Sequence, residues 1–288
     1  MKKILIILTI LLPLRTFCQE LFFVENFYDR YTIIDSLTRF DNYSLTRYAT
    51  GGGDNFYVTN DLKIVIPNLY DFTVFDLHQN QIDTIIKIPN IPTAKTGAEE
   101  QYLLSFDMTQ DQTIYYELAA ETYRLDFNEC NLYKFKNSSI EKIDLPNGMN
   151  FINFDISPNG ERMAFAFTEE KDKYNIETLF VFDLFKRELM RVDTAYQFGF
   201  DINEKFTFWE NHDLFYSKNG IILKYDLEQK SIKEIEIPIS KPIDSFVKLE
   251  NNFYLISDRK LWLWNGTDLK LIYEPKKLNY ISTLRIKE

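Results

Sequence analysis

The stretch that decides the fold is FINFDISPNGERMAFAF, from Phe151 to Phe167. Its first six residues are a short and largely apolar run, which indicates a buried strand. Pro158 cannot extend a ladder of hydrogen bonds, and Asn159-Gly160 tolerates the positive φ angles of a tight turn. After the turn, apolar and other residues alternate with a period of two. The stretch therefore predicts a β-hairpin, and only repetition along the chain distinguishes a repeat fold from an isolated hairpin in another β fold.

A second pattern recurs along the chain, in which an apolar strand ends with an aromatic residue and Asp or Asn before a polar turn. Its copies end at Asp76, Asn137, Asp183, Asp226 and Asn265. Successive copies become more closely spaced, toward about 40 residues, which is the length of a four-stranded propeller blade. We place a sixth copy at Phe40-Asp41-Asn42.

Each copy belongs to a unit with an inner strand, a turn, a second strand, the strand that ends in Asp, and an outer amphipathic strand. The unit around the opening stretch is predicted to have strands at residues 151–156, 162–168, 178–184 and 188–193. The next two units have strands at 206–209, 214–217, 220–227 and 231–237, and at 244–249, 252–257, 260–264 and 268–273. One such sheet cannot bury both of its faces alone, so neighbouring units must stack.

The two ends of the chain together supply one more unit. Residues 280–286 provide a single strand, and residues 21–48 contain strand-like runs without a clear inner strand. Pairing the N- and C-terminal strands would close the ring and remove its exposed edges. The predicted fold is therefore all-β, a single β-propeller with six four-stranded blades; five or seven blades are the alternatives.

One segment resembles a known family. Residues 154–165, Phe-Asp-Ile-Ser-Pro-Asn-Gly-Glu-Arg-Met-Ala-Phe, resemble the WD40-like repeat of TolB-type propellers, which places a Ser-Pro-Asp-Gly turn between the first two strands of a blade. Asn159 stands where that repeat usually has Asp, and traces of the turn occur at residues 107–111 and 201–205. The resemblance implies a fold and no particular activity, because propellers have many unrelated functions.

The N-terminus has the pattern of a signal peptide. Lys2 and Lys3 precede an apolar run that ends at Pro13, and this run is much shorter than the ~20 residues of a membrane span. We expect cleavage after Cys18, so that residues 1–18 are the signal peptide and residues 19–288 are an exported propeller domain, periplasmic or secreted. The alternative is a lipid anchor on Cys18, although Phe17 stands where lipoprotein signals usually have a small residue.

Charge and cysteine content limit the partners and the bonds that the chain can form. The 43 acidic residues outnumber the 33 basic ones, and the net charge is −10. Such a chain repels nucleic acid and anionic lipids, so neither is an expected partner. Once Cys18 is removed, Cys130 has no partner for an internal disulfide. We expect a monomer or one component of an envelope complex.

The sequence contains no recognisable motif for catalysis, a metal or a cofactor. Gly51 to Gly53 are not followed by the Lys-Ser/Thr of a phosphate loop, and neither His78 nor His212 has a second His or Cys at ligand spacing. Gly-x-Ser-x-Gly is absent. We therefore predict no catalytic residue, metal or cofactor, and we interpret Trp209, Trp262 and Trp264 as packing residues in strands.

Candidate binding residues lie in the insertions by which the units differ, at residues 89–100, 119–130 and 169–177. In a propeller, the connections between blades open on the same face as those between second and third strands. These insertions would therefore surround one mouth with Gly51 to Asp54. The candidates are Asp54, Glu121, Tyr123, Asp126, Glu169, Asp172 and Tyr174. Carboxylates and tyrosine rings suit a cationic or polyhydroxylated ligand or a basic protein surface, whereas ordinary solvated loops of an acidic protein are the alternative.

Two functions follow as hypotheses. The first is a non-catalytic exported propeller that binds a protein or another extracytoplasmic ligand through its loop-rich face. The second is a hydrolase or lyase that acts on glycans, with paired carboxylates in the central mouth. A structural component of an envelope complex, which would need a flat apolar patch, is a third possibility.

Overall fold

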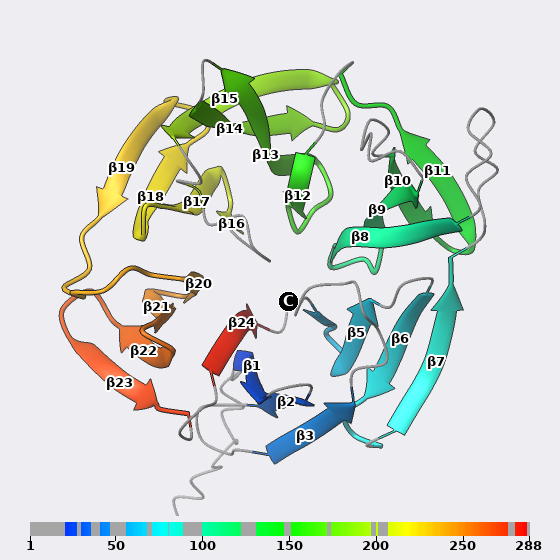
Figure 1. The fold of residues 1–288 in the computed structure, drawn as a ribbon, viewed down its shortest axis with the longest axis horizontal. Coiled ribbons are helices and arrows are strands. Elements are labelled where there is room, and N and C mark those ends of the chain that lie inside the picture. The colour runs from blue at the N-terminus through cyan, green and yellow to red at the C-terminus, as the bar shows by residue number, and fades with distance from the viewer. Residues whose placement is uncertain are drawn as a thin grey trace, which may run out of the picture.

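The computed structural model describes residues 21–27, 30–35, 41–46, 56–67, 71–79, 81–88, 100–121, 131–146, 151–171, 174–196, 200, 207–275 and 280–286. Within these ranges the regular structure consists of 24 strands in six four-stranded sheets, in which neighbouring strands are antiparallel. The sheets surround a central axis like the blades of a propeller (Figure 1). The predicted fold class and the count of six blades are therefore confirmed.

Five of the blades are continuous in the sequence, and each runs from its innermost to its outermost strand. Blade 1 contains β4 (Tyr57–Val58), β5 (Lys63–Pro67), β6 (Asp71–Asp76) and β7 (Gln81–Lys87). Blade 2 contains β8 (Glu100–Met108), β9 (Ile114–Glu121), β10 (Asn131–Lys136) and β11 (Ser139–Ile143). Blade 3 contains β12 (Phe151–Ile156), β13 (Arg162–Lys171), β14 (Tyr174–Asp183) and β15 (Glu188–Tyr196). Blade 4 contains β16 (Thr207–Glu210), β17 (Asp213–Lys218), β18 (Ile221–Asp226) and β19 (Ser231–Ile235). Blade 5 contains β20 (Ser245–Leu249), β21 (Asn252–Ser257), β22 (Lys260–Trp264) and β23 (Leu269–Tyr273).

Blade 6 is built from both ends of the described chain. Its strand order is β24 (Tyr280–Ile286), β1 (Leu21–Phe27), β2 (Arg30–Asp35) and β3 (Asp41–Thr46). The register pairs Leu21 with Ile286 and Phe23 with Leu284. Leu21 and Leu284 are buried in one apolar cluster with residues of blade 5. The ring is thus closed by pairing of the N- and C-terminal strands, as the sequence predicts.

In blades 1, 3 and 4, an Asp at the end of the third strand caps the turn to the outer strand. Asp183 Oδ1 accepts hydrogen bonds from the backbone N–H groups of Phe185 and Lys186, at 3.1 and 2.8 Å. Asp76 and Asp226 accept the corresponding pairs of bonds in blades 1 and 4. A side-chain acceptor at this point satisfies two donors that the ladder leaves free, which explains why the residue recurs.

The sixth copy of this pattern lies elsewhere than predicted. Asp41 begins the outer strand β3, whereas the third strand of blade 6 is β2, which ends at Asp35. Asp35 and Asp41 are paired in the register across this turn. The prediction at Phe40-Asp41-Asn42 was wrong because Asp35 follows the aliphatic Ile34, so the aromatic residue that marks the other copies is missing.

The conspicuous turn of the opening stretch joins the first two strands of blade 3. The Ser157 hydroxyl donates to Asn159 Oδ1 at 2.8 Å and accepts from the backbone N–H of Arg162 at 2.9 Å. Gly160 has a φ angle of 70°, which a residue without Cβ adopts easily. Thr59 and Thr109 make similar bonds to Asp61 and Asp111, so the trace at residues 107–111 is a turn of this kind.

The corresponding turn of blade 4 contains Asn211 and His212. The predicted trace at residues 201–205 precedes the innermost strand of that blade and lies outside the described residues.

Buried charged side chains join the innermost strands of successive blades. Asp107 Oδ2 accepts from the backbone N–H of Ile156 at 2.7 Å. Asp155 Oδ2 accepts from the backbone N–H and the hydroxyl of Thr207, at 2.9 and 2.8 Å. These bonds connect blade 2 to blade 3 and blade 3 to blade 4. Between blades 6 and 1 the side chain is the donor and not the acceptor. Arg285 Nε donates a hydrogen bond to the carbonyl of Phe56 at 2.8 Å.

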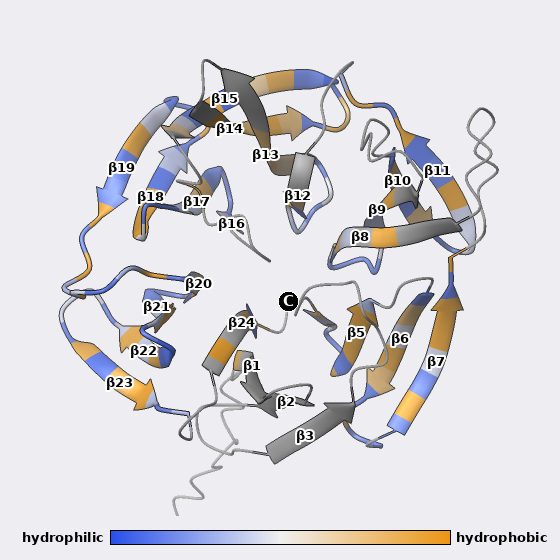
Figure 2. Ribbon diagram, viewed as in Figure 1, coloured by the Kyte–Doolittle hydropathy of each residue, from blue (hydrophilic) through white to orange (hydrophobic). Residues whose placement is uncertain are grey.

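Apolar side chains fill the spaces between blades, and hydrophobic residues occur along the strands of each blade that Figure 2 colours by hydropathy. One cluster joins blade 3 to blade 4 and contains Leu179, Val181, Trp209, Leu214 and Tyr216, all buried. The other two tryptophans, Trp262 and Trp264, pack partly buried against the cluster between blades 4 and 5. The prediction that the tryptophans serve packing is confirmed.

Two carboxylates that each accept two hydrogen bonds allow a matched test of the connection between blades. Replacement of Asp155 by Ala leaves buried donors of Thr207 unpaired, so we expect the free energy of unfolding to fall by about 2 to 4 kcal/mol. Asp226 accepts two bonds inside an exposed turn, and Asp226→Ala should cost only about 1 kcal/mol. Urea unfolding of both variants measures the difference. An equal or larger loss in Asp226→Ala would contradict the role of Asp155.

Candidate functional site

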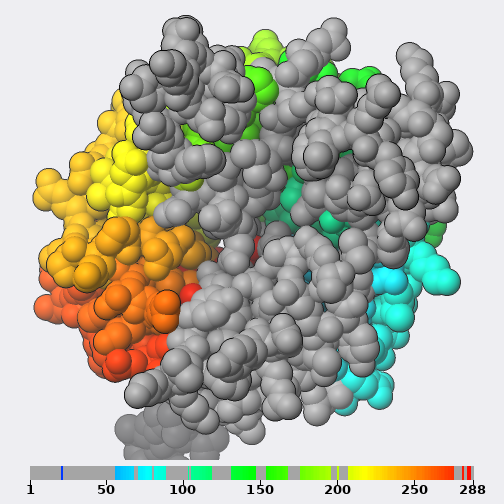
Figure 3. Space-filling model, in the orientation of Figure 1, coloured from blue at the N-terminus to red at the C-terminus, as the bar shows by residue number. Residues whose placement is uncertain are grey.

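The candidate site lies at the face of the ring where consecutive blades are joined and where second strands are joined to third strands. We call it the loop-bearing face. The antiparallel order of each blade places three predicted insertions there, between β7 and β8, between β9 and β10, and between β13 and β14. Figure 3 shows the molecule in the orientation of Figure 1, with described residues of blades 4 and 5, in yellow to orange, beside a narrow opening near the middle of the ring.

The insertion predicted at residues 169–177 is a continuation of two strands. The pairing of β13 with β14 extends to Lys171 and Tyr174, with Glu169 opposite Ile176. The stretch therefore forms a long hairpin, in which only residues 172 and 173 separate the strands. Residues 119–121 likewise belong to β9, with Glu121 opposite Glu100.

The predicted binding residues are only partly placed. Three lie in strands at this face: Glu121 ends β9, Glu169 lies in β13 and Tyr174 begins β14. Blade 3 brings Glu169 and Tyr174 into one hairpin, whereas Glu121 belongs to blade 2. Asp54, Tyr123, Asp126 and Asp172 lie outside the described residues. Their use in binding stays a prediction.

A fully buried carboxylate, Glu177, lies near this face between blades 3 and 4. Its Oε2 accepts from the backbone N–H of Phe200 at 3.1 Å, and among the described residues its Oε1 has no hydrogen-bond partner. Burial raises the pKa of Glu177, and the bond from Phe200 opposes this shift. A carboxyl group in this setting favours its protonated form more than an exposed one does. Glu177 can therefore hold a proton between the blades.

An ion pair crosses between the same two blades. Lys218 Nζ lies 2.9 Å from Asp193 Oδ2, and the Tyr216 hydroxyl donates to the same oxygen at 2.8 Å. Burial, reinforced by Asp193, raises the pKa of Tyr216. Lys218 also lies 5.9 Å from the centre of the Phe200 ring and pairs with Phe200 in an isolated β-bridge. Glu177, Asp193 and Lys218 thus hold Phe200, which follows β15, against blade 4.

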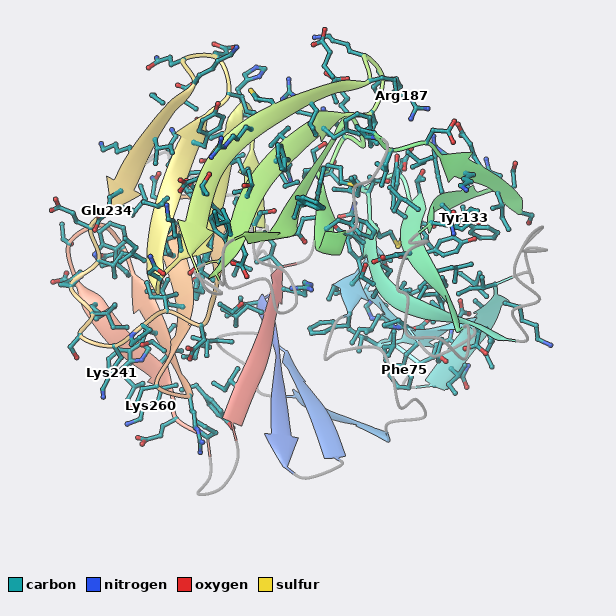
Figure 4. The ribbon with its side chains drawn as sticks, turned by 45° about the horizontal axis from the view of Figure 1, so that its top comes forward. Phe75, Tyr133, Arg187, Glu234, Lys241 and Lys260 are labelled. Atoms are coloured by element: carbon teal, nitrogen blue, oxygen red, sulfur yellow. The ribbon has the colours of Figure 1, made fainter. Side chains whose placement is uncertain are left out.

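A second pair of carboxylates lies on this face in blade 5. Asp244 immediately precedes the innermost strand β20, and Asp258 lies in the turn between β21 and β22. Although Asp244 is exposed, nearby protein atoms remove part of its hydration, and this effect together with the charge of Asp258 raises the pKa of Asp244. Lys241 and Lys260 lie on the same side of the ring (Figure 4), and Lys260 pairs with Glu274 at 2.9 Å.

The described residues hold neither a metal-binding cluster nor a membrane span. No group of three or more His, Cys, Asp or Glu side chains within the described ranges could hold a metal ion. In that same part of the chain, no helix has the length and hydropathy needed to cross a membrane.

Sequence analysis did not select Glu177, Asp193 or Phe200. Glu177 lies two and four residues before Leu179 and Val181, so the period of two along β14 puts all three on the same face of the strand. That alternation could have identified Glu177 as a carboxylate that faces the core. Asp193 and Phe200 gave no such signal, because their partners lie in another blade.

The pH dependence of stability tests the protonation of Glu177. Because the pKa of the folded state is raised above its ordinary value of 4.5, the stability that the protonated group provides is fully present below pH 4.5. It is lost as the pH rises through the folded-state value. The wild type should therefore lose stability relative to Glu177→Gln as the pH rises above about 4.5, measured by urea unfolding. Glu188→Gln, at an exposed strand residue, is the control, and a pH dependence of Glu177→Gln no larger than that of the control would contradict the assignment.

Comparison with known proteins identifies the fold without a family. No family model matches the chain, and no curated protein matches it. A chain in the crystal structure of the nidogen/laminin complex superposes with a TM-score of 0.61 and 10% identity, over 94% of this chain and 98% of that chain. A protein of unknown function from Bacteroides caccae gives a TM-score of 0.59 and 12% identity, over 92% of this chain and 97% of the other. At this identity the likeness establishes a β-propeller fold alone.

Proposed function

We propose that the chain is an exported, non-catalytic propeller of the TolB type that binds a protein or another extracytoplasmic ligand through its loop-bearing face. The observation that carries the proposal is the set of polar contacts between blades 3 and 4. There Glu177, Asp193 and Lys218 hold the chain at Phe200 in place. A framework of this kind positions loops for binding without supplying a catalytic motif.

Two further points support the proposal. The Ser157 turn of blade 3 resembles the turn of the TolB-type repeat, apart from Asn159 in place of Asp, and forms a compact hydrogen-bonded turn. A similar fold is present in a nidogen/laminin complex, so a ring of this kind is found within a protein assembly. We also propose that residues 1–18 direct export and are cleaved, which leaves residues 19–288 as the functional domain.

Charge-reversal substitutions on the loop-bearing face test this function. Glu121→Lys combined with Glu169→Lys should weaken partner capture at least about tenfold, because both positions lie at the rim of the proposed surface. Partners are recovered on the immobilised mature protein from envelope extracts and quantified by mass spectrometry. Glu161→Lys with Glu228→Lys is the matched control, since both exposed residues lie in turns on the opposite face. Equal loss in the control, or no loss in the first variant, would contradict the proposal.

A glycan-acting enzyme is the second candidate, and the pair Asp244 and Asp258 favours it. Loss of hydration and the charge of Asp258 raise the pKa of Asp244, and a carboxyl group with a raised pKa near a second carboxylate suits the general acid catalysis of glycoside cleavage. If the chain is such an enzyme, turnover on a glycan panel should be abolished by Asp244→Asn and kept by Asp268→Asn, which alters an exposed turn on the opposite face. Absence of turnover in the wild type excludes this candidate for the glycans tested.

A further inference from the structure

The turn between β14 and β15 exposes a phenylalanine. The Phe185 side chain is 74% exposed, more than any other large hydrophobic residue in the described part of the chain. This turn lies on the face opposite the loop-bearing face, where third strands are joined to outer strands. Single exposed apolar residues are common on protein surfaces, so exposure alone assigns no role to Phe185.

Comparison with the equivalent turns of the same protein shows that the fold does not need this side chain. His78, Phe185 and Glu228 occupy one position, two residues after the capping Asp. In each case the backbone N–H of that residue donates to the capping carboxylate, at 2.8, 3.1 and 2.9 Å. Blades 1 and 4 form the same turn with a polar, exposed residue at this point. The phenyl ring is therefore an addition to the turn and not a requirement of it.

Two basic residues, Lys186 and Arg187, follow Phe185 in a turn whose backbone is held by hydrogen bonds. Lys186 and Arg187 are both exposed, and Lys186 lies 3.8 Å from Asp183. The backbone N–H of Arg187 donates to the carbonyl of Asp183 at 2.9 Å. Its guanidinium donates to the carbonyl of Asp144 in blade 2, also at 2.9 Å, and Figure 4 shows Arg187 at the border with that blade. The turn is thus held before any partner arrives, which lowers the entropic cost of binding.

We propose that Phe185, Lys186 and Arg187 form a second protein-binding site, whose partner offers an apolar pocket bordered by carboxylates. Phenylalanine and arginine are both enriched at protein interfaces relative to the rest of the surface. The two cations favour a partner surface of opposite charge. An anionic membrane fits less well, because the net charge of −10 repels it over the rest of the molecule.

This site is independent of the proposed function of the loop-bearing face. The turns between third and outer strands emerge on the opposite side of the ring, so two partners could bind the protein together without contacting the same residues. A propeller that binds two proteins on opposite faces would act as a scaffold protein.

Site-specific photocrosslinking tests the second site in cells that naturally produce the protein. The photoreactive amino acid p-benzoylphenylalanine replaces Phe185 in the full chain, and the same probe at Glu228 is the matched control in the equivalent turn. We expect a protein adduct from position 185 that position 228 does not give. Peptide mapping should place it in an apolar segment of the partner next to Asp or Glu residues. A lipid adduct, the same adducts from both positions, or none from position 185 would overturn the proposal.

Binding of the purified crosslinked partner then measures the contribution of each side chain. Phe185→Glu gives blade 3 the residue that blade 4 already has, so the Tm should be unchanged while the Kd rises at least about tenfold. Arg187→Gln should raise the Kd by up to about fivefold and should make binding less sensitive to salt. A Kd that Phe185→Glu leaves unchanged would contradict the anchoring role. Equal binding by a Glu121→Lys, Glu169→Lys variant would show that this site acts separately from the loop-bearing face, and loss of binding there would contradict that separation.

Discussion

The ring depends on buried charged side chains that reach from one innermost strand to the next. The innermost strand of each described sheet is paired on one side only, so its other edge must find partners across a blade boundary. Asp107 and Asp155 supply acceptors for backbone N–H groups of the following blade, and Arg285 supplies a donor to Phe56 where the ring closes. Leaving such buried groups unpaired would cost more than the bonds themselves contribute, so these few contacts fix the order and spacing of the blades.

Hydrogen bonding also distinguishes Asp155, which joins two blades, from Glu177 at the candidate site. Asp155 accepts hydrogen bonds from the backbone and the hydroxyl of Thr207 at the blade boundary, whereas Glu177 accepts one from Phe200 and its other oxygen has no partner among the described residues. A buried group that is only half satisfied does not add to stability, and such groups collect where a protein holds a proton or a ligand. The loop-bearing face therefore combines hydrogen-bonded contacts between blades with a buried carboxylate, Glu177, that is only partly hydrogen-bonded within the described part of the chain.

Local patterns in the sequence were enough to predict the blades. The Ser157 turn and the capping Asp residues depend on bonds within a few positions of the chain, so they leave a repeated signature. Where the signature was weak the prediction failed, as at the end of β2, where Asp35 follows an aliphatic residue and not an aromatic one. The hairpin at Glu169 was mistaken for a loop because its residues are polar on both sides. Contacts between blades, such as Asp193 with Lys218, depend on three-dimensional stacking that no spacing in the sequence reveals.

The rate of hydrogen exchange at the backbone amides of Ile156 and Thr207 tests the account most directly. Both amides donate to a carboxylate of the preceding blade and not to a strand of their own sheet. If these bonds hold the ring, both amides should exchange only when the whole domain unfolds, with the same free energy of opening as the core of β13. Exchange as fast as that of the exposed outer strand β19 would show that the blades stack without these carboxylates and would contradict the account.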